Sequence, residues 1–348
     1  MSSSVDISII CPAFNEADGI SSAVAKLTQC IDALPSSAEV LIINDGSTDQ
    51  TVKLAKEAIG GDHRFRILSH RVNFGRGRAL RTGFHEARGR IVITSEGDLS
   101  WGAEVIPRMI NYLDDNPAKD AVFASPHLAG GGYQNVPRHR VMLSKIGNHI
   151  LGFLYTGGLT MTTGMTRAYR AEAIKPHLFT HDGKELHLEI SHRLLTLGYR
   201  IGEVPAILSW PEPQAGVQSR AGRTNWSKVS KLVRSHMAFG LLHGVDRIIA
   251  PAVLLLTMAI LFFGGWALFN LLTGQVSIFL AALTATLMIL WINVVVGFFL
   301  LNHIFEVQKD VWRSQRQMSF VFGHKREYEG DYYFEEALHS GADTTGAP

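Results

Sequence analysis

Acidic and amide side chains end three short apolar runs near the N-terminus. They lie in Pro12–Glu16, Asn44–Asp49 and Glu96–Asp98. If each run is a strand of one parallel sheet, the carboxyl ends meet at a single edge, which is where such sheets bind ligands. Carboxylates gathered at that edge repel one another, and a hard divalent cation would offset the repulsion. Because oxygen ligands suit Mg²⁺ or Mn²⁺, we expect one of these ions as the cofactor.

The sequence has no Gly-x-x-x-x-Gly-Lys-Ser/Thr loop, the motif whose backbone amides cradle phosphates. A metal at a sheet edge without such a loop indicates a nucleotide diphosphate that is held through the cation. Basic residues between Arg64 and Arg90 alternate with glycines and lack regular aromatic spacing. This pattern favours a loop that faces an anionic ligand over a nucleic-acid surface.

Apolar runs alternate with amphipathic segments between residues 5 and 125. The alternation predicts an α/β fold, a mostly parallel sheet with helices on both faces. The expected strands are Val5–Cys11, Glu39–Asn44, Phe65–Ser69, Ile91–Ser95 and Ala121–Ser125. The expected helices lie near Ala17–Cys30, Thr48–Ile59, Arg76–Ala87 and Val105–Leu113. The two cysteines are too few for a disulfide framework, and Cys11 is expected to be a small buried hydrophobic residue.

The low share of charged residues, 18% of 348, hides a division of the chain. No Asp, Glu, Lys or Arg occurs from Ile248 to Phe305, whereas residues 1–247 have the composition of a soluble domain. Helices over 248–272 and 277–301 would each be about 37 Å long, enough to cross a bilayer core of about 30 Å. The short loop between them cannot cross the bilayer, so we expect a hairpin with both ends on one side.

Basic residues precede the first span and follow the second, and the loop between the spans has none. The positive-inside rule therefore places both termini in the cytoplasm, as in a protein of the bacterial inner membrane or an equivalent membrane. No signal peptide is visible. Two-span anchors often associate, so a homo-oligomer is a further expectation. The other expected divisions are a cytoplasmic α/β domain over 1–219, an amphipathic juxtamembrane segment over 220–247, and a cytoplasmic tail over 302–348 with a disordered end.

The sequence resembles the inverting, GT-A-fold glycosyltransferases of family 2. The segments that carry the resemblance are Pro12–Glu16, Asn44–Asp49, Asn73–Ala79 and Glu96–Leu99. Arg167–Arg170 and Gly198–Pro205, with the C-terminal hairpin, narrow it to the polyprenyl-phosphate and dolichyl-phosphate sugar transferases, which include dolichyl-phosphate mannose synthase. The resemblance implies an enzyme that moves a sugar from a UDP- or GDP-linked donor to a polyprenyl phosphate.

The resemblance also implies roles for single residues. Those expected to contact the nucleotide sugar or to shape its loops are Pro12, Ala13, Asn15, Glu16, Asp45, Gly46, Ser47, Gly75, Arg78 and Gly97. Glu96 and Asp98 occupy the metal-binding positions, and Asp98 also counts as catalytic. Arg167 stands near the acceptor phosphate, and Arg220 and Arg223 belong to a basic segment that closes over the site next to the membrane.

Four residues depart from the family pattern. They are Glu96 in place of Asp, Ser100 in place of Gln, His127 in place of Arg, and Met161 in place of Asp. Glu96 can still bind a hard cation, although its extra methylene changes the reach of the carboxylate. The departures concentrate around the acceptor, so the sequence indicates the donor more firmly than the acceptor.

The acceptor determines which further groups the chemistry needs. A lipid phosphate has a second pKa near 6 and is ionised at pH 7, so it needs orientation by Arg167, Arg170, Arg220 or Arg223 rather than a base. A hydroxyl of a lipid or glycan would need a base, for which Asp182, Glu185 and Glu189 are candidates. A catalytically silent, membrane-tethered subunit that binds nucleotide sugars is a third alternative, supported by the departures at Glu96 and Met161.

Overall fold

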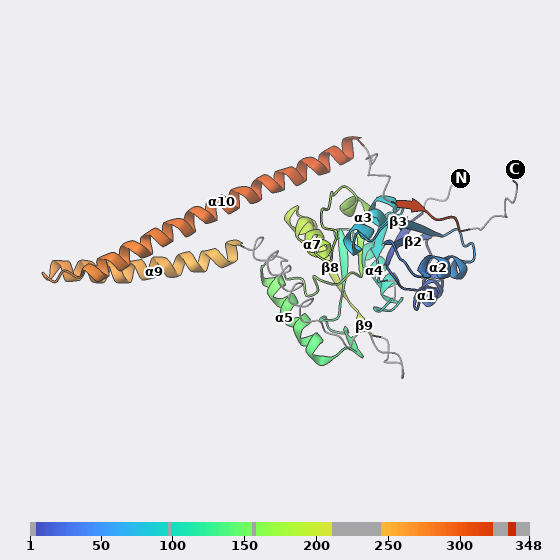
Figure 1. The fold of residues 1–348 in the computed structure, drawn as a ribbon, viewed down its shortest axis with the longest axis horizontal. Helices are drawn as coiled ribbons and strands as arrows, with labels where there is room; N and C mark the ends of the chain where they lie inside the picture. Colours follow the sequence, from blue (N-terminus) through green and yellow to red (C-terminus); the bar gives the residue numbers. More distant parts are fainter. Residues whose placement is uncertain (1–4, 97–98, 155–157, 211–244, 323–332, 339–348) are drawn as a thin grey trace. The chain divides into compact units, whose positions relative to one another are not determined.

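The structure is a computed structural model that describes residues 5–96, 99–154, 158–210, 245–322 and 333–338. The chain divides into two compact units. One combines Met1–Val233 with Gln315–Pro348, and the other is Arg234–Ser314. The first unit is built around a sheet, and the second contains long apolar helices (Figure 1).

An eight-stranded sheet organises the first unit. Its spatial order is β10 (Tyr333–Glu335), β3 (Phe65–His70), β2 (Ala38–Asn44), β1 (Ile7–Ala13), β4 (Ile91–Thr94), β7 (Arg167–Arg170), β5 (Ala121–Ser125) and β8 (Ile201–Pro205). β10 runs antiparallel to β3, and β7 runs antiparallel to β4 and β5, while the other pairs are parallel. The carboxyl ends of β1, β2 and β4 therefore meet at one edge.

Helices cover both faces of this sheet because successive strand residues point to opposite faces. Ile9 of β1 packs with α1 (Ile20–Asp32), α2 (Thr51–Ile59) and α4 (Val105–Asp115). Ile10 packs on the other face with α3 (Arg76–Glu86), α6 (Ala171–Ile174) and α7 (Leu186–Thr196). The unit also contains α5 (Arg138–Leu154) and a small parallel sheet of β6 (Gly132–Gln134) and β9 (Ile207–Ser209). The α/β fold with a mostly parallel sheet is confirmed.

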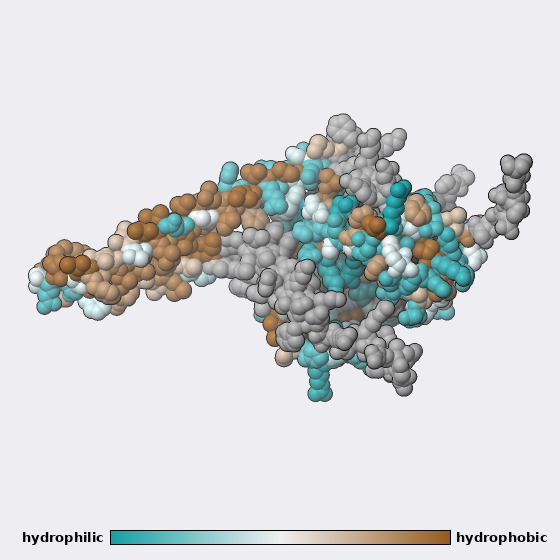
Figure 2. Space-filling model, in the orientation of Figure 1, coloured by the Kyte–Doolittle hydropathy of each residue, from teal (hydrophilic) through white to brown (hydrophobic). Residues whose placement is uncertain are grey.

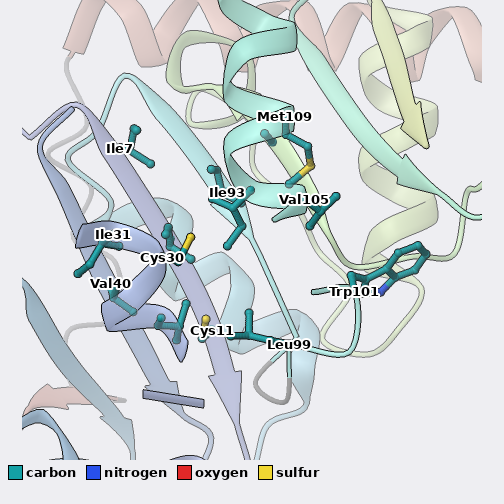
Figure 3. Close-up of a cluster of buried hydrophobic side chains, with 14 of the residues drawn as sticks. Ile7, Cys11, Cys30, Ile31, Val40, Ile93, Leu99, Trp101, Val105 and Met109 are labelled. Atoms are coloured by element: carbon teal, nitrogen blue, oxygen red, sulfur yellow. The ribbon is translucent and has the colours of Figure 1, made fainter. Parts of the chain in front are cut away.

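Cys11 and Cys30 lie in the first of these two cores, in the same cluster as Ile7, Ile31 and Val40 (Figure 3). Both are free thiols, and Cys11 is 3% exposed. Burial, with a smaller contribution from Cys30, raises the pKa of Cys11 to about 12. The thiol is therefore a protonated packing group, as the sequence indicates.

The strands and helices expected between residues 5 and 125 are all present, with ends shifted by a few residues. Two strands are not among those expected from the sequence. β7 enters the sheet between β4 and β5 in the opposite direction, and β10 lies inside the region 302–348 that was expected to be a tail. The expected disordered end falls largely on 339–348, outside the described residues.

The second unit contains most of two helices, α9 (Val245–Leu272) and α10 (Ile278–Phe322). Within them, Ile249–Leu272 and Ile278–Met318 are long and apolar enough to cross a membrane, and each contains an 18-residue window with a mean hydropathy of 2.3. Apolar side chains dominate their visible surface (Figure 2). α10 continues well past residue 301, the expected end of the second span, because no Pro or Gly follows until Gly323 and (i, i+3) pairs such as Lys309–Glu306 support the helix.

Candidate functional site

An open pocket of about 640 Å³ lies where β1, β2 and β4 end, and we call it the strand-end pocket. Six residues that the sequence analysis singled out line it: Pro12, Ala13, Glu16, Asp45, Gly75 and Glu96. Arg76, Lys184 and Trp210 also line it, although the sequence analysis gave them no role. The expected gathering of three strand ends into one site is therefore present.

The other expected residues fall into two groups. Those that are described but do not line the pocket are Asn15, Gly46, Ser47, Arg78 and Arg167. Those that lie outside the described residues are Gly97, Asp98, Arg220 and Arg223, and their roles stay predictions.

Asp45 is 3% exposed, and three donors fix its carboxylate. Oδ1 accepts from the backbone N–H of Phe74 at 3.0 Å, and Oδ2 accepts from that of Gly75 at 2.8 Å. Nδ1 of His70 lies 2.8 Å from Oδ1, and because a carboxylate only accepts, Nδ1 is the donor. The carboxylate thus sits at the N-terminus of α3, where negative charge is favourable, and Oδ2, which accepts one hydrogen bond from the described residues, has capacity to accept another from a ligand.

Asn15 and Ser47 join the loops that follow β1 and β2. Ser47 Oγ accepts from the backbone N–H of Asn15 at 3.0 Å, and Asn15 Oδ1 accepts from that of Thr48 at 2.9 Å. Gly46 has a φ of +69°, and a Cβ there would lie 2.4 Å from the carbonyl carbon of Val72. These residues shape the loops that carry the pocket rather than its surface.

The glycines that begin α3 allow a second loop to approach closely. The backbone N–H of Gly77 donates to the carbonyl oxygen of Asp182 at 2.7 Å, and a Cβ on Gly77 would lie 2.6 Å from the carbonyl carbon of Asp182. Nε of Arg78 and Nη1 of Arg81 lie 3.2 and 2.7 Å from Oδ1 of Asp182. Arg78, expected beside the donor, is thus paired with Asp182, and this candidate base is held by two guanidinium groups.

The same approach brings Lys184 into the strand-end pocket with Arg76 and Glu96. Partial desolvation and the nearby Arg76 guanidinium lower the pKa of Lys184, while Glu96 and Glu185 oppose the shift. Two cationic side chains beside carboxylates suit a diphosphate that binds together with a cation.

Glu96 offers carboxylate oxygens to this pocket, and the hydroxyl of Ser100 donates to one of them. Such hard oxygen donors are those that Mg²⁺ and Mn²⁺ prefer, so the residues present fit the expected ion. Across the described part of the chain, no group of three or more His, Cys, Asp and Glu side chains could hold a metal by itself. A complete site would need Asp98 or ligand oxygens.

Arg167 lies in the protein core, where it is 1% exposed. Nε donates to the carbonyl oxygen of Gly164 at 2.7 Å, and Nη1 donates to that of His187 at 3.0 Å and to Ser191 Oγ at 3.1 Å. Its guanidinium carbon lies 4.0 Å from the centre of the Phe123 ring. This corrects the expected position near an acceptor phosphate, because the donors of Arg167 are turned to backbone and side-chain oxygens of the core.

Glu189 is also buried and engaged, at 4% exposed. Its carboxylate accepts from the backbone N–H groups of Thr180 and His181, from His181 Nδ1 at 2.9 Å and from Arg193 Nη2 at 2.9 Å. Burial opposes the shift, but these donors together lower the pKa of Glu189. Glu189 is therefore a structural anchor rather than an available base or the surface charge of a helix.

A second hollow, of about 830 Å³, lies beside α5, and we call it the α5 pocket. His127, Lys145 and His149 line it, and His127 Nε2 lies 3.2 Å from the hydroxyl of Tyr133. Burial and the charge of Lys145 lower the pKa of His127. The carboxylate of Glu203 fixes Thr160, another residue that lines this pocket, because it accepts from the backbone N–H of Thr160 at 3.0 Å.

Comparisons with known proteins relate the chain to glycosyltransferases. Residues 8–178 match the family model Glycosyl transferase family 2. A polyprenol monophosphomannose synthase from Mycolicibacterium smegmatis is 28% identical over 221 residues, which are 62% of this chain and 80% of the relative. A dodecaprenyl-phosphate galacturonate synthase from Rhizobium johnstonii is 32% identical over 112 residues, 32% of this chain and 33% of the relative.

An undecaprenyl-phosphate 4-deoxy-4-formamido-L-arabinose transferase from Edwardsiella ictaluri is 28% identical over 182 residues, 51% of this chain and 52% of the relative. Among solved structures, glucosyl-3-phosphoglycerate synthase from Mycobacterium tuberculosis, in complex with Mn²⁺ and UDP-glucose, matches with a TM-score of 0.52 and 20% identity. The match covers 69% of this chain and 79% of that chain. It confirms the GT-A-like fold.

Proposed function

We propose that this glycosyltransferase, whose family 2 domain is matched over residues 8–178, moves a sugar from a nucleotide sugar to a polyprenyl phosphate at a membrane. One observation carries the proposal: carboxylates and cations line a single open pocket at the strand ends. Such a pocket can hold the diphosphate of a nucleotide sugar without a phosphate-cradling loop. The names of three relatives supply the acceptor class, since each is a polyprenol- or polyprenyl-phosphate enzyme.

On the donor side, the fixed carboxylate of Asp45 would accept from the nucleoside, and Arg76 and Lys184 would bind the diphosphate. Glu96 and Asp98 would hold Mg²⁺ or Mn²⁺. When bound, the ion would offset the negative charge that develops on the departing diphosphate. A protein of the same fold binds Mn²⁺ with UDP-glucose, which supports this choice of cofactor.

On the acceptor side, Lys145 gives the α5 pocket the positive charge that a lipid phosphate needs, and the N–H groups of His127 and His149 could donate hydrogen bonds to it. Strand β6 connects residues that line the two pockets. Tyr133 lines the α5 pocket, and the carbonyl oxygen of the next residue, Gln134, accepts at 3.0 Å from the backbone N–H of Trp210, which lines the strand-end pocket. Donor and acceptor groups could thus meet across β6.

In the transfer, a phosphate oxygen of the acceptor forms a bond to the anomeric carbon of the sugar. The bond from that carbon to the nucleotide diphosphate breaks, and its electron pair leaves with the diphosphate. Attack from the face opposite the leaving group inverts the anomeric centre. An ionised phosphate needs no base, and the engaged carboxylates of Asp182 and Glu189 favour it over a hydroxyl acceptor.

A membrane anchor fits a lipid acceptor. We propose that α9 and α10 cross the bilayer as a hairpin with both termini in the cytoplasm, as the distribution of basic residues predicts. The basic segment with Arg220 and Arg223 would then lie next to the membrane and orient the acceptor headgroup.

The test is transfer by the full chain in detergent, with radiolabelled UDP- and GDP-sugars, Mg²⁺ or Mn²⁺, and either polyprenyl phosphate or polyprenol. We expect product with the phosphate alone, released by mild acid as a sugar phosphodiester is. Asp98→Ala should abolish turnover, and Asp115→Ala, which removes an exposed acid from α4, should keep it.

Acid-stable product on polyprenol would replace the phosphate acceptor with a hydroxyl. Full turnover in Asp98→Ala would overturn the metal-site assignment. Nucleotide-sugar binding without transfer to either lipid would favour a non-catalytic subunit.

A further inference from the structure

The carboxylate of Asp45 is held from behind by a buried histidine. The His70 side chain is 1% exposed, and its Nδ1 donates to Asp45 Oδ1 at 2.8 Å. On the other side of the ring, Nε2 lies 3.0 Å from the hydroxyl of Thr82 in α3. Both ring nitrogens are therefore engaged, and the imidazole has one orientation that satisfies them.

The C-terminal strand closes the space around this imidazole. In the antiparallel pair of β10 and β3, Tyr333 lies directly opposite His70, and the two ring centres are 6.4 Å apart. Phe74 contacts the imidazole edge-on, with ring centres 5.6 Å apart. His70 is thus flanked by one ring from the pocket loop and one from the C-terminal segment.

Polar contacts fix β10 in this register. The hydroxyl of Tyr333 donates to Glu86 at 2.8 Å, and Arg66 donates to both carboxylate oxygens of Glu335 at 2.8 and 3.2 Å. A hydrogen bond from His85, with others from Tyr333 and Arg66, lowers the pKa of Glu86 to about 2 despite burial. The strand is consequently bound through charged groups as well as through its backbone.

We infer that His70 is a positioning residue for the donor site and that β10 holds it in place, so that the C-terminal segment contributes to nucleotide affinity. The inference rests on the proposed function, because the carboxylate that His70 orients is the one that would contact the nucleoside. Without the imidazole, Asp45 loses one of its three donors and the orientation that presents its lone pair to the pocket. Without the Tyr333 ring, the imidazole loses one of its two aromatic neighbours.

The test measures binding of UDP and of GDP to the detergent-solubilised full chain by calorimetry, together with transfer kinetics. His70→Ala should raise the Kd of the bound nucleotide and the KM of the nucleotide sugar about ten-fold, and leave the acceptor KM unchanged. His70→Asn should stay within about three-fold of the wild type, since the asparagine amide can donate where Nδ1 did. His63→Ala, at an exposed histidine, is the matched control.

Tyr333→Ala tests the contribution of the tail. It should weaken nucleotide binding about three-fold, whereas Tyr333→Phe, which keeps the ring, should bind nearly as the wild type does. If His70→Ala does not fold, this pair and His70→Asn carry the test.

If His70→Ala binds the nucleotide as tightly as the wild type, the inference is wrong and the proposed function is unaffected. If His70→Ala does not fold, unchanged affinity in Tyr333→Ala has the same meaning. If the wild type binds neither nucleotide, the proposed donor site is wrong and the inference falls with it. If His70→Ala weakens nucleotide binding but polyprenyl phosphate is not an acceptor, the inference stands and the acceptor assignment fails.

Discussion

Two sets of charged side chains in the sheet-containing unit differ in what their charges face. The pocket set lines an open hollow and consists of Asp45, Arg76, Glu96 and Lys184. The scaffold set bonds to backbone groups and to neighbouring side chains, lines neither pocket, and consists of Arg167, Glu189, Arg193 and Glu203. Both sets contain residues that the sequence marks as functional. A charge acts on a ligand only where protein atoms have left part of its hydrogen-bonding capacity unused.

The variant with the largest expected effect is Arg167→Ala, which tests whether Arg167 belongs to the scaffold set. We expect it to lower the free energy of unfolding by about 3 kcal/mol or more, because several buried carbonyls lose a charged donor and the core gains a cavity. Arg167→Lys should recover only part of the lost free energy of unfolding, since an ammonium group cannot reproduce the planar fork of N–H donors of the guanidinium. Urea or thermal unfolding measures the change. A stable Arg167→Ala protein with a raised acceptor KM would contradict its place in the scaffold set and support the acceptor role that the sequence predicts.

Removing the cationic side chains of the pocket set should affect donor binding rather than stability. Lys184→Ala or Arg76→Ala should leave unfolding nearly unchanged and raise the KM of the nucleotide sugar, by about 1.5–3 kcal/mol of lost diphosphate binding for each. Lys26→Ala removes an exposed cation from α1 and is the control. Loss of stability with unchanged donor KM would move these residues into the scaffold set.

Gly46→Ala probes the loop that carries Asp45. The positive φ and the 2.4 Å approach to the carbonyl carbon of Val72 leave no place for a methyl group, so we expect a loss of about 2 kcal/mol in stability together with weaker nucleotide binding. Gly19→Ala is a matched control, because a Cβ there meets nothing within 4 Å. Equal thermal unfolding of the two variants would contradict this account of the loop.

The smallest expected effect is the pH dependence of the His181–Glu189 pair. The hydrogen bond that His181 Nδ1 donates to the Glu189 carboxylate raises the pKa of His181 above its usual 6.5. The pair therefore stabilises the fold fully below pH 6.5, and this contribution is lost as the pH rises through the higher folded-state pKa. The stability difference between wild type and His181→Gln should be larger at pH 6 than at pH 9 by thermal unfolding. His139→Gln, at an exposed position, is the control, and an equal difference at both pH values would exclude the coupling.

Local patterns were sufficient for most of the central fold. β1 to β5 follow from short apolar runs, because helices bury both faces of the sheet, and α1 to α4 follow from helical apolar periodicity, because each buries one side. β7 and β10 could not be found this way. Arg167–Arg170 and Tyr333–Glu335 carry few apolar residues, and they are strands because of long-range pairing with β4, β5 and β3.

The site was predictable where a motif ends a strand, as at Asp45 and Glu96. Lys184 was not, because it reaches the strand-end pocket through the close approach of Asp182 to Gly77, which leaves no periodic signal. Arg167 was misplaced because its motif matches a family pattern, while the direction of its guanidinium depends on Gly164 and other partners in the core.

The position of β10 also affects how the protein is made. Until Tyr333–Glu335 has been synthesised, β3 is the outermost strand on its side of the sheet, with backbone groups open to pairing with another chain. The roughly 260 residues after His70, which include both apolar helices, need about 13–50 s at ribosomal rates of about 5–20 residues per second. Arg66 is the charged side chain of β3, and a charge on an edge strand disfavours such pairing during that interval. A chain shortened before Tyr333 would keep this open edge throughout its life.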